Sequence, residues 1–133
     1  MSKDLSPIIL AFSGGLDTSF CVPWLKENYG REVITACVDT GGIDKAAAVA
    51  LEERAKALGA IEHILIDAKQ DFFDTVIKYL IAGNVLRGQA YPLCVGAERG
   101  IQATLLAEEA TKRGYTTVAH GCTAAGNDQV RFE

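Results

Sequence analysis

The chain has 133 residues, which is enough for one domain with a sizeable hydrophobic core. Hydrophobic residues make up 49% of it, an ordinary value for a globular protein, so the composition argues against disorder. The net charge of -4 comes with no run of Lys or Arg, which argues against nucleic acid as the main partner. A small phosphate compound is compatible with this charge, because backbone amides can hold phosphate without basic side chains.

The cysteines and the N-terminal segment bear on metal binding and on the compartment. Four cysteines are spread along the chain and form no C-x-x-C pair: Cys21, Cys37, Cys94 and Cys122. Their spacing argues against structural zinc and predicts small packing residues in a reducing compartment, although a disulfide between two of them stays open. The apolar run over residues 7–12 is too short for a signal peptide or a membrane span, so we expect a cytoplasmic protein with no membrane partner.

The first half of the chain alternates apolar runs with helical patterns. Residues 8–12 form an unbroken apolar run that stops at Ser13-Gly14-Gly15, as a strand buried on both faces would. The apolar residues that come next are spaced for a helix that ends near Gly30. Three elements follow in order: a strand over residues 32–38, a turn over 39–42, and an alanine-rich helix over 45–58 that Gly59 closes.

The second half continues this alternation and ends in a polar segment. The residue pattern predicts, in order, a strand over 61–66, a helix over 70–84, a loop over 87–92, a helix over 95–113 that Gly114 caps, and a strand over 115–119. Residues 120–129 are polar and carry no regular pattern, which predicts a flexible tail. Residues 130–133 begin a new apolar–polar alternation, which predicts the start of a further element.

This order of elements predicts an α/β fold. Strands that alternate with helices form a parallel sheet sandwiched by helices, in a Rossmann-like arrangement. In such sheets, ligands bind beyond the carboxyl ends of the strands. Three loops rich in Gly, Ser, Thr, Asp or Asn are predicted at that edge, over residues 13–19, 39–44 and 120–129. We therefore expect the binding site among these three loops.

The sharpest motif is Ser13-Gly14-Gly15-Leu16-Asp17-Thr18-Ser19, which joins the first strand to the first helix. The glycines let the backbone turn tightly and approach a ligand, and the helix N-terminus favours an anion such as phosphate. A carboxylate would repel phosphate, so Asp17 indicates Mg²⁺ between the two. The motif lacks the Lys of the P-loop and the spacing of the dinucleotide fingerprint. The alternative is a plain connecting turn in which Asp17 or Thr18 caps the helix.

This motif resembles the S-G-G-x-D-S/T loop of the ATP pyrophosphatases, which hold the pyrophosphate part of ATP while AMP moves to a substrate. Further segments resemble the argininosuccinate synthases: Tyr91-Pro92-Leu93 with Arg99, residues 119–123, and the run Gly126-Asn127-Asp128-Gln129-Val130-Arg131-Phe132-Glu133. The resemblance extends over residues 8–133. It implies the fold of the N-type ATP pyrophosphatases, which is adenine nucleotide alpha hydrolase-like, and a ligase of arginine biosynthesis.

The resemblance also implies a two-step reaction and a set of site residues. The ureido oxygen of citrulline attacks the α-phosphorus of ATP, pyrophosphate leaves, and the aspartate amine then displaces AMP. The implied ATP contacts are Ala11, Phe12, Ser13, Gly14, Gly15, Leu16, Asp17, Thr18, Ser19, Val38 and Gly121. The implied citrulline contacts are Tyr91, Arg99, Asn127 and Arg131, and the implied aspartate contacts are Thr123, Asn127 and Asp128. The implied catalytic residues are Asp17, which would also reach Mg²⁺ of the bound nucleotide, Asn127 and Asp128.

The chemistry of the residues agrees with these roles. An arginine suits a carboxylate, Asp128 suits an α-ammonium group, and Asn127 can donate and accept between two substrates. No side chain stands out as a nucleophile or a general base, so catalysis would depend on positioning and charge neutralisation. Taken singly, Tyr91 would brace a loop, Arg99 would be a solvated helix charge and Asn127-Asp128 would be a turn. Their occurrence together in one order favours the functional interpretation, whereas His120 is interpreted as a strand-end histidine satisfied by the backbone.

The sequence also departs from the family's pattern. Gly96 stands where the family often has a small hydroxyl residue, Ala124 replaces a glycine, Ala125 replaces a larger residue, and Val38 replaces an alanine near adenine. The family's enzyme continues into a second domain that completes the site and builds a homotetramer, so we expect an excised nucleotide-binding domain or a short relative. Two other functions stay open: adenylylation of another carbonyl or amide substrate, and a non-catalytic module that binds ATP or AMP.

Overall fold

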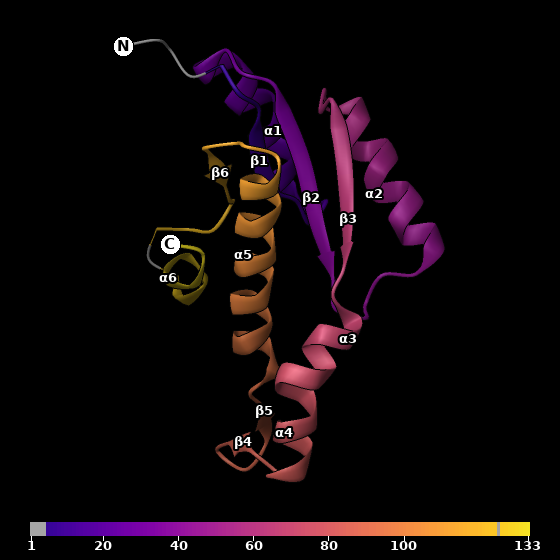
Figure 1. Cartoon of the computed structure of the whole chain (residues 1–133), viewed down its shortest axis with the longest axis vertical. Coiled ribbons are helices and arrows are strands. Elements are labelled where there is room, and N and C mark those ends of the chain that lie inside the picture. Colours follow the sequence, from indigo (N-terminus) through magenta and orange to yellow (C-terminus); the bar gives the residue numbers. More distant parts are fainter. Residues whose placement is uncertain (1–4, 125) are drawn as a thin grey trace.

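The computed structural model describes residues 5–124 and 126–133, and Figure 1 shows the chain as a ribbon. The sheet strands are β1 (Ile8–Ala11), β2 (Val33–Asp39), β3 (Glu62–Asp67) and β6 (Val118–Ala119). The main helices are α1 (Leu16–Tyr29), α2 (Lys45–Ala57) and α5 (Cys94–Lys112), and a short helix α6 (Asn127–Phe132) follows β6. Between β3 and α5 lie α3 (Lys69–Phe72), η1 (Phe73–Ile77), α4 (Lys78–Ala82), β4 (Leu86–Arg87) and β5 (Tyr91–Pro92).

The four sheet strands are parallel and lie in the order β3-β2-β1-β6. The strand β1 is central, since Ile9 is level with Ile34 of β2 on one side and with Val118 of β6 on the other. All strands therefore end at the same edge of the sheet, as the alternation of strands and helices predicted. The prediction of a parallel α/β sheet is confirmed.

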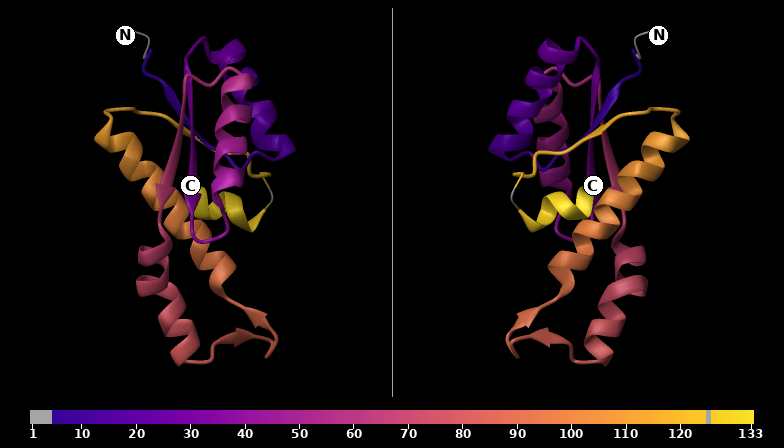
Figure 2. Two further views of the ribbon diagram at one scale, coloured as in Figure 1. Left: turned by 90° about the vertical axis from the view of Figure 1, so that its right-hand side faces the viewer. Right: turned by 90° about the vertical axis from the view of Figure 1, so that its left-hand side faces the viewer.

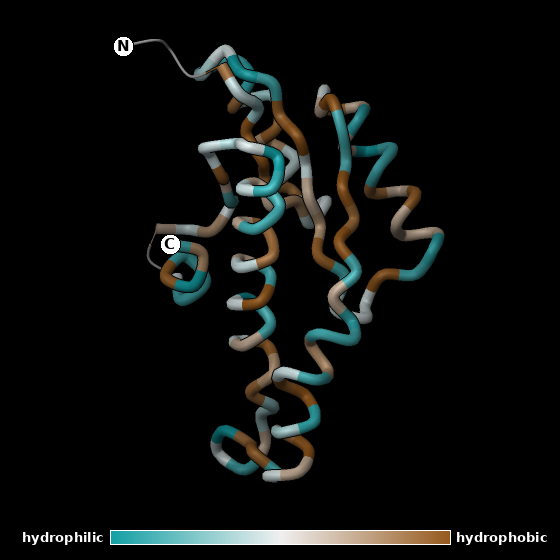
Figure 3. Tube along the Cα trace, viewed as in Figure 1, coloured by the Kyte–Doolittle hydropathy of each residue, from teal (hydrophilic) through white to brown (hydrophobic). Residues whose placement is uncertain are grey.

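Both faces of the sheet are covered, and β1 contributes to the core on each face. Ile8 and Leu10 pack with buried residues of α1 and α2, whereas Ile9 packs with Leu106 of α5. Side chains alternate between the faces of a strand, so an unbroken apolar run is what a strand covered on both sides requires. Figure 2 shows α1 and α2 on one side of the sheet and α5 on the other. In Figure 3, much of the tube along the central strands is brown, the colour of hydrophobic residues.

The predicted helix ends agree with the structure. The helix α1 ends at Gly30, whose left-handed φ of 62° suits a residue without a side chain. The helix α2 begins after Asp44, whose Oδ1 accepts a hydrogen bond of 2.8 Å from the amide of Ala47. Beyond α2 and α5, Gly59 and Gly114 also adopt positive φ angles, of 98° and 71°.

Several predicted segments take a different form. The predicted loop over 87–92 contains an antiparallel pairing of β4 with β5, and the helical segment over 69–82 includes a π-helical turn, η1. The strand predicted over 115–119 is reduced to Val118–Ala119. The alternation over 130–133 belongs to a helix, α6, because Phe132 packs against the core cluster of α5. Four residues are too few to distinguish a period of two from a helical period.

The segment from α3 to β5 projects beyond the end of the sheet in Figures 1 and 2. No side chain from residue 73 to residue 93, all of which the structure describes, is buried, whereas most of the largest fully buried side chains lie on β1 and β2. A search for helices that are long and apolar enough to cross a bilayer finds none in the described residues.

Asp39, the last residue of β2, holds the turn that leads to α2. Its side chain is only 4% exposed and accepts hydrogen bonds from the amides of Gly41, at 2.8 Å, and Ile43, at 3.3 Å. The Lys69 ammonium donates to its other oxygen at 2.8 Å and also faces Asp67 at 3.2 Å. The hydrogen bond from Lys69 is the main reason why the pKa of Asp39 is lowered, and the two amides lower it further against the opposing effect of burial.

Replacement of Asp39 by Asn, which cannot carry the charge, is expected to lower the free energy of unfolding by about 1–3 kcal/mol at pH 7. A carboxyl group with a lowered pKa in the folded state stabilises the protein above its unfolded pKa of about 4, and this contribution is lost as the pH falls through the folded value. Urea unfolding between pH 7 and pH 3 should show a gap between wild type and D39N that narrows at acid pH. The exposed Asp71, changed to Asn, is the control, and a gap of constant size would contradict the assignment.

Candidate functional site

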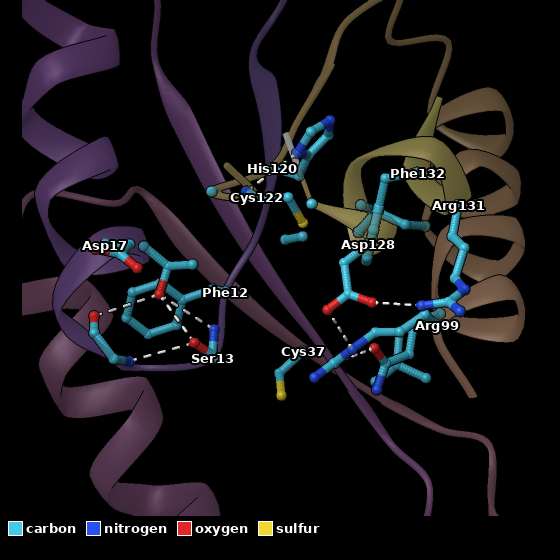
Figure 4. Close-up of a pocket in the computed structure, with 18 of the residues that line it drawn as sticks. Phe12, Ser13, Asp17, Cys37, Arg99, His120, Cys122, Asp128, Arg131 and Phe132 are labelled. Carbon is cyan, nitrogen blue, oxygen red and sulfur yellow. Dashed lines mark hydrogen bonds and ion pairs between the residues drawn. The ribbon is translucent and has the colours of Figure 1, made fainter. Parts of the chain in front are cut away.

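A cavity of about 610 Å³ lies beyond the carboxyl ends of β1, β2 and β6, at the edge where the topology predicted a site. The ends of β1 and β2 contribute Phe12, Cys37 and Val38 to its wall, and the segment after β6 contributes Gly121. The first turn of α1 lies on one side of this cavity, and α5 and α6 lie on the other, as Figure 4 shows. The cavity therefore lies between two groups of side chains from distant parts of the sequence.

The loop over residues 13–19, called the phosphate loop after the family motif that it resembles, forms the first group, and its shape depends on Gly14 and Gly15. Gly14 is buried with a φ of 72°, and a Cβ added to it would lie 2.5 Å from Cδ2 of Leu51 on α2. Gly15 is extended and begins α1, so the first free amides of that helix face the loop. The Ser13 and Thr18 hydroxyls lie 3.2 Å apart, and the amide of Ser13 donates to Thr18 Oγ1 at 3.3 Å. Both hydroxyls lie at the cavity, where they can be redirected toward an anion.

The segment after β6 approaches this loop closely at Gly121. A Cβ added to Gly121 would lie 3.2 Å from Cγ2 of Thr18 and 3.6 Å from the Thr18 amide nitrogen. A side chain at position 121 would therefore make a tight contact with the first turn of α1. The contact brings two of the three predicted loops together, 103 residues apart in the sequence (from Thr18 to Gly121).

The second group is formed by α5 and α6 and is charged. Asp128 Oδ1 accepts a hydrogen bond of 2.8 Å from Arg131, and its Oδ2 lies 3.6 Å from Nε of Arg99. Arg99 also donates to Oε1 of Gln102 at 2.7 Å. All three charged side chains are more than one third exposed, and Figure 4 shows Asp128 between the two guanidinium groups. The residues predicted for citrulline and aspartate thus interact with one another.

The cavity brings together most of the residues predicted for ATP and the amino acids. On its wall are Ala11, Phe12, Ser13, Gly15, Leu16, Asp17, Thr18, Val38, Arg99, Gly121, Thr123, Asn127, Asp128 and Arg131. Gly14 and Ser19 are described by the structure but are not on this wall: Gly14 is buried within the loop, and the Ser19 amide donates to the Gly15 carbonyl at 3.0 Å. Of the two alanines that depart from the family pattern, Ala124 is exposed, and Ala125 lies outside the described residues.

Tyr91 lies at a second cavity, of about 550 Å³, between the β4–β5 pair and α6. This cavity shares Asn127 and Arg131 with the first, and is also lined by Arg87, Leu93, Val95 and Gly96. Gly96 leaves room for Arg131, since an added Cβ would lie 3.1 Å from NH2 of that arginine. Among the described residues, none forms an ion pair with Arg87. This arginine was not predicted as a site residue, because it stands alone in a predicted loop.

The four cysteines are free thiols, and His120 is hydrogen-bonded to the backbone. All four cysteines fall in the described part of the chain and are free thiols, so the disulfide that the sequence left open is absent there. Cys37 and Cys122 line the first cavity, and burial is the main reason why their thiol pKa values are raised. His120 accepts a hydrogen bond of 3.3 Å at Nδ1 from the amide of Cys122, and its ring stacks 5.4 Å from Phe132. His120 is therefore satisfied by the backbone, as predicted.

Further wall residues were not predicted from the sequence: Ala36, Gln102, Leu106, Gly126 and Phe132. The apolar ones gave only a core signal, and Gln102 gave the signal of an ordinary polar helix residue. Within the described residues, no group of three or more His, Cys, Asp or Glu side chains could hold a metal ion.

Comparisons with known proteins agree with this geometry. Residues 7–133 match the family model of the arginosuccinate synthase N-terminal HUP domain. The argininosuccinate synthase of Xylella fastidiosa is 46% identical over 95% of this chain, and that of Sulfurisphaera tokodaii is 44% identical over 95%. The chain spans 31% and 32% of the lengths of these two relatives. A predicted subunit of tRNA methyltransferase from Methanocaldococcus jannaschii has a similar fold, with a TM-score of 0.64 and 24% identity over 92% of this chain and 55% of that one.

The positive φ of Gly14 makes this position sensitive to any side chain. Replacement of Gly14 by Ala is expected to lower the free energy of unfolding by about 1–2 kcal/mol, because alanine is strained in the left-handed region and its Cβ would displace Leu51. Gly42 is the matched control, since no atom lies within 4 Å of its added Cβ and its φ is not in that region. Urea unfolding measures both variants; equal stability of G14A and G42A would contradict this account of the loop.

Proposed function

The chain belongs to the argininosuccinate synthase family, and from this premise we propose that it binds ATP and activates citrulline by adenylylation. The observation that carries the proposal is that one cavity joins the phosphate loop to Asn127, Asp128 and Arg131. A reaction that transfers AMP to an amino acid needs groups that bind ATP and groups that bind the amino acid around one cavity.

In this proposal, ATP lies along the ends of β1 and β2. The hydroxyls of Ser13 and Thr18 and the first amides of α1 would hold its phosphates, which suits the partial positive charge of a helix N-terminus. The adenosine would lie beside Val38 and Gly121, where contacts to the backbone do not depend on the side chain. The departure from alanine at Val38 is then of little consequence, because a backbone contact is unchanged by it.

The amino acids would occupy the side of the cavity formed by α5 and α6. Arg99, Asn127 and Arg131 would contact citrulline, with Tyr91 reached through the second cavity, and Thr123, Asn127 and Asp128 would contact aspartate. The ureido oxygen of citrulline would attack the α-phosphorus of ATP with loss of pyrophosphate. The aspartate amine would then attack the activated carbon, with loss of AMP, to give argininosuccinate. No side chain of this chain needs to form a covalent bond, so positioning supplies the catalysis.

The residues at the loop fit a magnesium ion that is bound mainly by the nucleotide. Asp17 is exposed in the first turn of α1 and lines the cavity, so that its carboxylate can reach a cation between itself and the phosphates. Magnesium is commonly bound through one or two carboxylates together with substrate phosphates and waters. When bound, the ion would neutralise charge on the departing pyrophosphate. The role left to Asp17 is to orient the metal–nucleotide complex.

The proposed reaction involves more of the enzyme than this chain. Since the chain spans about a third of the curated relatives, we propose that segments corresponding to the rest of their length complete the amino-acid site and form a homotetramer in the cytoplasm. The pairing of Asp128 with Arg99 and Arg131 favours one competing function, a module that binds ATP or AMP without joining amino acids. In that function the two arginines would remain neutralised by Asp128.

Release of pyrophosphate from ATP and magnesium, by this chain, tests the proposal. The proposal expects release that depends on citrulline and does not require aspartate, because the first half-reaction needs only citrulline. Binding of ATP without any citrulline-dependent release would mean either that the chain is the binding module or that its amino-acid site requires the segments corresponding to the rest of the relatives' length. Calorimetry with ATP on the same preparation ensures that the absence of release is not caused by unfolded protein.

A second prediction concerns Asp17. Replacement of Asp17 by Asn should weaken binding of magnesium–ATP by about tenfold, or about 1.4 kcal/mol, because the cation loses a negatively charged ligand. Binding of metal-free AMP should be unchanged. Glu27 is an exposed acid at the other end of α1, so E27Q is the control and should bind both ligands as wild type does. If D17N weakens binding of both ligands equally, Asp17 is only a structural cap.

A further inference from the structure

A chain of hydrogen bonds connects the loop after β2 with the charged group on α5 and α6. The Thr40 hydroxyl donates to Oε1 of Glu98 at 2.6 Å, and the Gln102 amide nitrogen donates to the same oxygen at 3.2 Å. The side-chain oxygen of Gln102 accepts from NH1 of Arg99 at 2.7 Å, and Nε of Arg99 faces Asp128 at 3.6 Å. Three segments of the protein, the loop after β2, α5 and α6, are thus connected through polar side chains.

Both ends of this series of hydrogen bonds are held by further contacts. Thr40 directly follows Asp39, whose buried carboxylate fixes the turn through Gly41, Ile43 and Lys69. At the other end, Asp128 is also bonded to Arg131. Gln102 and Arg99 are on the wall of the first cavity, whereas Glu98, among the described residues, is not. Glu98 therefore acts on the cavity only through its neighbours.

The donor and acceptor types allow one arrangement of this chain. A carboxylate only accepts and a guanidinium only donates, while a glutamine amide does both. With its nitrogen bonded to Glu98, Gln102 must present its oxygen to Arg99. A long arginine side chain has many rotamers, and fixing one of them before a ligand binds removes an entropic cost of binding.

We propose that Glu98 is a positioning residue, which holds Arg99 through Gln102 and is itself held by Thr40. This inference rests on the proposed function, since Arg99 is assigned to citrulline there. In this arrangement the turn after β2, next to the ATP side of the cavity, sets the position of a guanidinium on the amino-acid side. Loss of Glu98 leaves Arg99 charged and present but no longer fixed, so the affinity for citrulline falls while the affinity for ATP stays.

Variants at two positions test the chain of bonds. One oxygen of Glu98 accepts both bonds, so E98Q retains them, whereas E98A removes them. T40V removes the donor with little change of shape, and T40S retains it. In E98A and T40V the apparent Kd for citrulline should rise about fivefold to tenfold, a loss typical of one hydrogen bond. In E98Q and T40S it should stay within twofold of wild type, and E108A, at an exposed glutamate of the same helix, is the matched control.

Two results would overturn the inference. Citrulline affinity in E98A equal to that in E108A would show that Glu98 positions nothing, and an equal loss of ATP and citrulline affinity would show a general effect on folding. If wild type itself ignores citrulline, the proposed function fails separately. The side-chain signal of the Arg99 Nη1–H group, which donates to Gln102, is identified by its loss in R99K and decides the structural claim independently of citrulline. It should be sharp and protected from exchange in wild type and E98Q, and broadened in E98A and T40V; identical signals in all four would exclude the positioning role.

Discussion

The pairing of β1 with β2 on one side and with β6 on the other is the constraint on which the site depends. It places the phosphate loop after β1 between the end of β2 and the segment after β6. Gly121 then approaches Thr18 so closely that an added Cβ would lie only 3.2 Å from Cγ2 of that threonine. Because β1 is buried on both faces, core packing sets its position, and this also fixes where the loop after β1 begins. The rigidity of the sheet thereby positions the side of the cavity formed by residues 13–19.

The sequence predicted those parts of the fold whose signal is long. The apolar runs of β1, β2 and β3 and the helices that end at Gly30, Gly59 and Gly114 lie close to where they were expected. The two-residue strands β4 and β5 and the six-residue helix α6 are shorter than any window in which a period can be recognised. Their conformations depend on tertiary contacts, such as the packing of Phe132 against the cluster around Leu106, that a local pattern does not contain.

The site was predictable to a similar extent, and for a similar reason. The phosphate loop is a continuous motif, so its residue types and its context were visible together. Glu98 and Gln102 lie one turn apart on a helix, where polar residues usually face solvent, and nothing local connects them with Thr40 in a loop 58 residues earlier. Tyr91 was grouped with Asn127 and Arg131 by resemblance, and all three line the second cavity, which only the fold of β4 and β5 defines.

The charged residues of α5 and α6 at the first cavity pair with one another, and their exposure explains how this side of the cavity can still accept a ligand. The wall carries two carboxylates, Asp17 and Asp128, and two guanidinium groups, Arg99 and Arg131. The pairs at Asp128 are partly exposed, and such pairs contribute only about 0–1 kcal/mol, so a ligand can replace them at little cost. An amino acid brings one ammonium group and one carboxylate, which can take over the interactions with Asp128 and with an arginine, respectively, and leave the net charge of the cavity unchanged. In the absence of ligand, the pairs at Asp128 balance the charge of these side chains and limit the geometries that they adopt. A zwitterion therefore fits this side of the cavity better than a ligand of one sign, which agrees with the proposal that the phosphates of ATP bind to the loop on the other side.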